Sequence, residues 1–175
     1  MRFHPRDVLT FAEVDTEKIE KISFFGLRYV LRMWVLAFVP TLVISFVAVA
    51  AYIIVGLSAP RYPPPTSALT FIFGSLVFSP LVETAIMIPI IYLIKRVFHR
   101  LAYIAAVSGA LWGLSHALFA WPAGLWVAWP FFVFTLCFVA WRPISLGLAY
   151  WYTAACHMLY NAGLGILIGL AAIQK

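Results

Sequence analysis

Four polar side chains in apolar segments of this chain could do chemistry together: Glu83, His116, His157 and Asn161. Glu83 stands in the stretch "SPLVETAIMIPII" and is the only acidic residue after Glu20. A carboxylate beside an imidazole can hold a water molecule and take its proton. A second histidine, with an asparagine four residues later on the same helix face, can donate hydrogen bonds to a developing oxyanion. Water, base and oxyanion donors are what hydrolysis of an amide requires.

The same residues allow two other chemistries. One glutamate and two histidines form a ligand set typical of catalytic zinc, so Glu83, His116 and His157 could hold the metal. The H-E-x-x-H helix motif is absent, however. A Glu–His–His chain could also relay protons or bind a cation in a transporter. We therefore expect no cofactor, with zinc as the alternative.

The elements that must position these residues are membrane-spanning helices. The chain has 175 residues, of which 65% are hydrophobic and 10% charged, whereas soluble domains are about half apolar and a quarter charged. One helical crossing of the hydrocarbon core needs about 20 apolar residues. The sequence therefore predicts an all-α membrane protein, a bundle of about five transmembrane helices. These are expected at 33–57, 68–94, 102–120, 125–141 and 144–173.

The titratable side chains are expected at a similar depth. Counted from the basic residue at the end of each span, Glu83, His116 and His157 lie 12, 16 and 15 residues inside. These separations correspond to roughly 18, 24 and 22 Å along a helix. A charge at the bilayer centre costs at least about 2.5–3.5 kcal/mol, and this cost falls when polar groups face one another. We expect the three side chains to converge on one site, with Trp112, four residues before His116, as its wall.

Several of these residues also have a purely structural interpretation. A histidine in a span can bond a backbone carbonyl or a neighbouring serine, and a lone asparagine can join two helices. Small and sulfur-containing side chains in the spans are predicted to serve close packing: Gly109, Gly113, Ala117, Cys137 and Cys156.

The first thirty residues differ from the rest, because they hold five of the six acidic residues. Residues 1–30 are predicted to form a cytoplasmic or interfacial amphipathic helix that leads into the first span. The alternative is a solvated tail that becomes helical only near Phe24. Residues 31–175 are predicted to form the transmembrane bundle.

Basic residues predict the orientation and the partners. The net charge of +6 is spread over residues that flank apolar runs, which favours contact with anionic lipid headgroups and not with nucleic acid. With five spans the asymmetry places the N-terminus in the cytoplasm and the C-terminus on the opposite side. Expected partners are membrane lipid and a membrane peptide or protein, either as substrate or as partner subunit. One side collects Arg28, Arg32, Lys95, Arg96, Arg100 and Arg142, and the other Arg61 and Lys175.

Three stretches, "SPLVETAIMI", "LWGLSHAL" and "AACHMLYNA", resemble the motifs of the CPBP intramembrane proteases. This family includes relatives of the type II CAAX prenyl endopeptidase and the bacteriocin-processing, or Abi, proteins. Its pattern is EExxxR on one helix, FxxxH on the next, and HxxxN or a variant on a later helix. The resemblance covers about residues 79–165, in the family's order and spacing.

The resemblance implies roles for individual residues. Glu83 takes the place of the first glutamate and would activate water. His116 takes the FxxxH histidine that helps hold the water, with Trp112 in place of the phenylalanine. His157 and Asn161 take the HxxxN positions, which look like oxyanion stabilisers.

The first motif departs from the family pattern, because Thr84 and Ile88 stand where it has the second glutamate and the arginine. Because the second glutamate and the arginine are both absent, neither charge is left buried without its partner.

The motifs and this departure from them lead to two expected functions. The chain is expected to be a glutamate-dependent intramembrane endopeptidase acting on a membrane-associated or lipidated substrate. The alternative is a degenerate relative that acts as a membrane binding partner, immunity factor or complex subunit.

Overall fold

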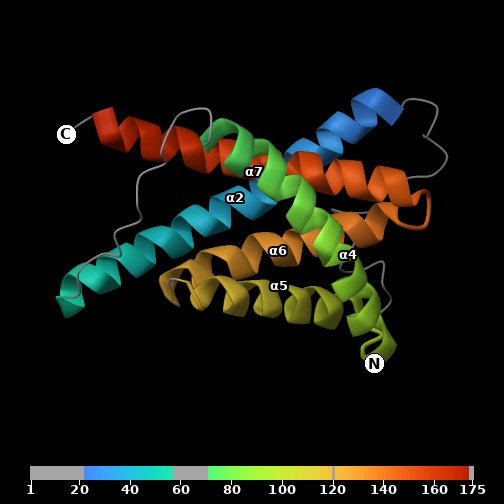
Figure 1. Cartoon of the computed structure of the whole chain (residues 1–175), viewed down its shortest axis with the longest axis horizontal. Helices are drawn as coiled ribbons and strands as arrows, with labels where there is room; N and C mark the ends of the chain where they lie inside the picture. The colour runs from blue at the N-terminus through green and yellow to red at the C-terminus, as the bar shows by residue number, and fades with distance from the viewer. Residues whose placement is uncertain (1–21, 57–70, 120, 174–175) are drawn as a thin grey trace.

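A computed structural model describes residues 22–56, 71–119 and 121–173, and every element in these ranges is helical. The predicted all-α bundle is confirmed for this part of the chain. The second predicted span is occupied by a π-helix and an α-helix in direct succession, and each of the other four contains one continuous helix (Figure 1). The elements are α2 (Ile22–Val55), η2 (Phe71–Phe78), α4 (Ser79–Val97), α5 (Leu101–Ala117), α6 (Trp121–Trp141) and α7 (Leu146–Ile173).

Membrane association follows from the length and apolarity of the helices. Three segments are long and apolar enough to cross a membrane, namely Gly26–Ala51, Phe73–Val97 and Ala123–Trp141. Helix α5 is a shorter apolar helix of 17 residues, which corresponds to about 26 Å of helix. The three long segments indicate that the protein associates with a membrane.

Helix α6 is the centre of the bundle. Figure 1 shows α5 lying alongside α6, α2 and α7 crossing them, and α4 running diagonally over α7. The apolar stretch of α6 is 44% buried inside the protein. The corresponding stretch is 17% buried in α2 and 28% buried in η2 with α4. The most buried side chains of α6 form much of the core, including Val133, Phe134, Cys137, Phe138 and Trp141.

Helices α5 and α6 approach each other through glycines. A Cβ atom added to Gly113 would lie 2.8 Å from the carbonyl oxygen of Gly124, and one added to Gly124 would lie 2.9 Å from the Cβ of Ala117. Gly109 similarly faces the backbone of Ala128. The predicted small-residue stripe is therefore where the two backbones meet, as in other membrane helix pairs.

Two boundaries differ from the sequence prediction. Helix α2 begins at Ile22, so residues 22–30 belong to the same helix as the first span, and the predicted boundary at residue 30 falls inside it. The rest of the predicted interfacial segment, residues 1–21, lies outside the described residues. Helix α6 begins at Trp121, so "WPAG" forms its first turn, where a proline is tolerated because its missing N–H would be unpaired anyway.

Candidate functional site

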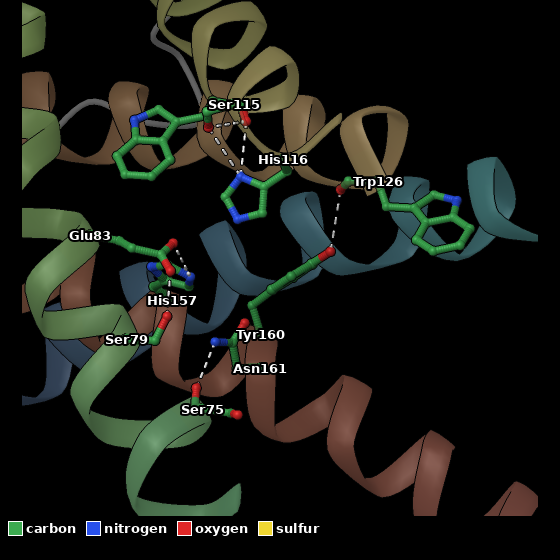
Figure 2. Close-up of polar contacts among 10 residues, drawn as sticks. Ser75, Ser79, Glu83, Ser115, His116, Trp126, His157, Tyr160 and Asn161 are labelled. Carbon is green, nitrogen blue, oxygen red and sulfur yellow. Dashed lines mark hydrogen bonds and ion pairs between the residues drawn. The ribbon is translucent and has the colours of Figure 1, made fainter. Parts of the chain in front are cut away.

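Three helices bring the predicted site residues to one region of the bundle. Helix α4 carries Glu83, α5 carries His116, and α7 carries His157 and Asn161. Figure 2 shows the side chains of Glu83 and His157 meeting, with the His116 ring directed toward them from α5. The convergence expected from matched depth is therefore seen for these three side chains.

The Glu83 carboxylate has a different partner at each oxygen. Ser79, one helical turn earlier on α4, donates a hydrogen bond from Oγ to Oε1 of Glu83. The other oxygen, Oε2, lies 3.9 Å from Nε2 of His157. This separation is longer than a hydrogen bond and becomes an ion pair when the imidazole is protonated. The Glu83 side chain is 21% exposed and that of His157 only 4%, so the carboxylate is the accessible member of the pair.

The His116 ring is oriented by its own helix. Its Nδ1 lies 2.9 Å from the carbonyl oxygen of Trp112, and Ser115 Oγ lies 3.3 Å from the same nitrogen. Ser115 also donates to the Trp112 carbonyl at 2.8 Å. A carbonyl oxygen can only accept, so Nδ1 must carry the hydrogen. The neutral ring then presents the lone pair of Nε2, the nitrogen that Figure 2 shows directed toward Glu83.

Aromatic rings of α6 and α5 surround the histidines. The Phe134 ring lies 4.6 Å from that of His157, and Phe131 meets the same imidazole edge-on at 5.3 Å. Trp112 stacks on Phe131 at 4.3 Å and lies 6.0 Å from the His116 ring. Trp112 is thus beside His116, as its spacing predicts. Charges among these rings interact more strongly than in water, because the surroundings are apolar.

Asn161 is placed differently from the other three predicted residues. Its Nδ2 donates to the carbonyl oxygen of Ser75 at 2.8 Å, and Figure 2 shows the amide directed toward η2. The π-helix η2 is thus fastened to α7 through this amide. In this structure the Asn161 amide therefore joins two helices, the structural interpretation weighed for it from the sequence.

Thr84 and Ile88, the two residues at which the first motif departs from the pattern it resembles, face the protein interior. Thr84 is 1% exposed, and its hydroxyl has no hydrogen-bond partner among the described residues. Ile88 packs against the apolar core. Nδ1 of His157 is likewise buried without a partner in the described ranges.

Sequence reasoning missed the residues that orient the site. Ser79 was detectable, because it precedes Glu83 by four residues and shares its helix face. Ser115 adjoins His116 in the sequence, and the ring contacts this serine and the Trp112 carbonyl, as the structural interpretation of a histidine in a span expects. Phe131 and Phe134 carried no signal, because the chain holds 15 phenylalanines.

The arrangement can perform general acid–base chemistry. Glu83 offers an accessible carboxylate, and the two imidazoles offer both a lone pair and a potential donor beside it. In the part of the chain that the structure describes, no three His, Cys, Asp or Glu side chains form a group that could hold a metal ion. The chain matches no protein-family model, no curated protein and no solved structure.

Proposed function

We propose that the protein is an intramembrane endopeptidase that hydrolyses a peptide bond of a membrane-associated or lipidated substrate. The observation that carries the proposal is the Glu83 carboxylate in a membrane-spanning segment. One of its oxygens is held by Ser79, the other faces His157, and His116 is directed toward it from a third helix. Ionisable groups within spanning segments are costly and generally serve a function.

The proposed reaction uses water as the nucleophile. Glu83 takes a proton from a water molecule, and the water oxygen attacks the carbonyl carbon of the substrate. Nε2 of His116 accepts the second hydrogen of that water and so helps to orient it. The N–H at Nε2 of His157 donates a hydrogen bond to the oxyanion, and the remaining amide hydrogen of Asn161 is the candidate second donor. The carboxylic acid of Glu83 then returns its proton to the leaving amine as the peptide bond breaks.

The motifs support a relationship with the CPBP intramembrane proteases, which we include in the proposal. The order Glu83, His116 and His157 along the chain, each on a different helix, supports it, together with the four-residue spacing of Trp112 to His116 and of His157 to Asn161. No step of the proposed reaction requires a metal ion.

The proposal is tested by replacing Glu83 with Gln. Glutamine keeps the size of the side chain but cannot take a proton, so the E83Q variant should accumulate an uncleaved membrane peptide in cells. The membrane peptides of wild-type and variant cells are compared by mass spectrometry. The H116Q variant should accumulate the same peptide. The matched control is H99Q, because His99 is exposed and lies outside the helices, and this variant should resemble the wild type.

A second function is favoured by Thr84, which is buried, and Ile88, which packs partly buried against the core, where the family pattern has an acid–base pair. In this case the protein binds a membrane partner, as an immunity factor or complex subunit, and does not cleave it. The two proposals differ in the E83Q experiment. An unchanged peptide profile, with a partner that still co-purifies with E83Q, would overturn the protease and support the binding protein.

We propose further that the N-terminus lies in the cytoplasm and the C-terminus on the opposite side. Five crossings place the cluster of basic residues in the cytoplasm, as the positive-inside rule requires. Alkaline phosphatase, which is active only outside the cytoplasm, should be active when fused after Lys175 and inactive when fused after Ser145. The reverse pattern, or equal activity at both points, would contradict this topology.

A further inference from the structure

The described residues carry all of their lysine and arginine side chains at one end of the bundle. Arg28 and Arg32 lie near the start of the spanning segment of α2, and Lys95 and Arg96 near the end of that of α4. Arg100 and Arg142 lie directly outside α5 and α6. The only carboxylate among the described residues, that of Glu83, lies four residues after the start of α4 and three helical turns before Lys95. Within the described ranges, no carboxylate lies near Lys95, Arg96 or Arg142 at this end.

Contacts between helices show that these ends adjoin. The ring of Tyr29 in α2 meets that of Trp141 at the end of α6, 5.4 Å away. Tyr152, near the start of α7, fills the space beside Gly26. Figure 1 shows the start of α2, the end of α4, the end of α6 and the start of α7 on the same side of the molecule.

One part of this end is organised around Tyr92. Arg142 donates a hydrogen bond from Nε to the hydroxyl of Tyr92, and its guanidinium carbon lies 5.8 Å from the centroid of the tyrosine ring. Lys95 and Arg96 follow Tyr92 by three and four residues, so they lie on the same face of α4 one turn nearer its end. Nε is one of five N–H donors of Arg142, and the contact with Tyr92 fixes the direction of the others.

We propose that Tyr92, Lys95, Arg96 and Arg142 form a binding site for the phosphate of an anionic phospholipid. A guanidinium binds phosphate oxygens through two parallel hydrogen bonds, and basic residues near an anionic membrane surface attract its headgroups. The site lies at the end of spanning helices and thus at the level of the headgroups.

A lipid suits this place better than a soluble anion. Leu93 and Val97, which flank the basic residues on α4, are exposed large hydrophobic side chains. Acyl chains would cover them, whereas a free phosphate would leave them bare. The ligand is therefore expected to bring both a phosphate and a hydrocarbon chain.

The experiment measures binding of phosphatidylglycerol to the purified full-length protein in neutral detergent, by native mass spectrometry, with phosphatidylcholine as the comparison lipid. Wild type should retain phosphatidylglycerol selectively. The R142Q variant should bind it about tenfold more weakly, a loss typical of one charge-assisted contact. The Y92F variant keeps the ring and removes only the hydroxyl that orients Arg142, so it should weaken binding by a smaller factor. The thermal unfolding midpoint of the Y92F variant shows whether it is folded.

The matched control is R32Q, which removes one exposed charge from the same end but from α2. It should change the affinity by less than about twofold, because screened charges away from the site contribute little. Equal losses of phosphatidylglycerol affinity in R32Q and R142Q would show that the lipid responds to diffuse surface charge. This result would contradict the proposed site. Equal retention of the two lipids would overturn it as well. Displacement of the lipid by an equal concentration of inorganic phosphate would identify a soluble-anion site instead.

Discussion

The carboxylate of Glu83 is held by a neutral group from its own helix. In the family pattern that the motifs resemble, a second glutamate and an arginine stand beside the base, whereas Thr84 and Ile88 occupy these positions here. Both are turned into the core, where one unpaired charge would be strongly destabilising. Ser79 reaches Glu83 from the preceding turn and orients the carboxylate without adding a charge.

Replacement of Ser79 by alanine tests this orientation. The loss of one hydrogen bond to a charged acceptor corresponds to about 1.5–3 kcal/mol, so S79A should slow formation of the cleaved peptide about tenfold or more. The S79T variant retains a hydroxyl and should recover most of the activity. The measurement is the rate of product appearance in the membrane-peptide comparison described above.

A matched control separates orientation from general disturbance of this region. S75A removes a hydroxyl one turn earlier and leaves intact the Ser75 carbonyl that Asn161 binds. It should cleave at the wild-type rate. If S75A and S79A are equally slow, the effect belongs to the packing of η2 and α4 and not to the Glu83 carboxylate.

The sequence predicts the central part of the site because burial of polar groups is costly. Glu83, His116 and His157 are few, deep and on separate helices, so mutual contact is the arrangement with the lowest insertion cost. The actual partner of Asn161 could not be predicted. It binds the Ser75 carbonyl, and the π-helical geometry of η2 that presents this carbonyl has no signature in the sequence.

At the scale of elements, the α5–α6 pair depends on the absence of side chains at its glycines. Alanine stabilises a helix by up to about 1 kcal/mol relative to glycine, so G113A would be favourable in an isolated helix. In the protein its Cβ would lie 2.8 Å from the Gly124 carbonyl oxygen and 2.9 Å from the Ala128 Cβ. Overpacking of this kind costs about 1–3 kcal/mol. The net effect should be destabilisation.

The G113A variant is therefore expected to lower the free energy of unfolding by about 1–2 kcal/mol, because the cost of overpacking exceeds the gain in helix propensity. The measurement is unfolding in mixed micelles with increasing dodecyl sulfate. The control is G74A, because a Cβ at Gly74 meets nothing within 4 Å, and its stability should equal or exceed that of wild type. A G113A variant as stable as G74A would show that α5 and α6 can separate without cost.

The positions of the helices are predictable from apolarity and their ends are not. The five predicted spans each contain helix, because the hydrocarbon core requires every backbone group to be bonded within the segment. Helix α2 extends back to Ile22 through Arg28 and Arg32, since arginine is a good helix former at a membrane boundary. An apolarity criterion cannot detect such an extension.

For the whole molecule, the two cysteines report on the integrity of the bundle. Cys137 in α6 and Cys156 in α7 are both 0% exposed, and both are free thiols. They are the only cysteines of the chain. Neither can react with a maleimide until the helices around α6 separate, so their modification measures global opening of the bundle.

We expect both thiols to resist N-ethylmaleimide in the folded protein and to become reactive together as dodecyl sulfate is increased. Each of the single-cysteine variants C137A and C156A keeps one thiol. In each variant, labelling of this thiol should increase over the same range of dodecyl sulfate in which helix content falls. A cysteine introduced at Pro143, an exposed position in the turn after α6, should react at once and provides the reference for full accessibility. Reaction of Cys156 well before Cys137 would mean that α7 leaves the bundle separately, and His157 with it. Simultaneous reaction would instead show that α6 and α7 open as one cooperative unit, so that the histidine of α7 is held within it, as a preorganised site requires.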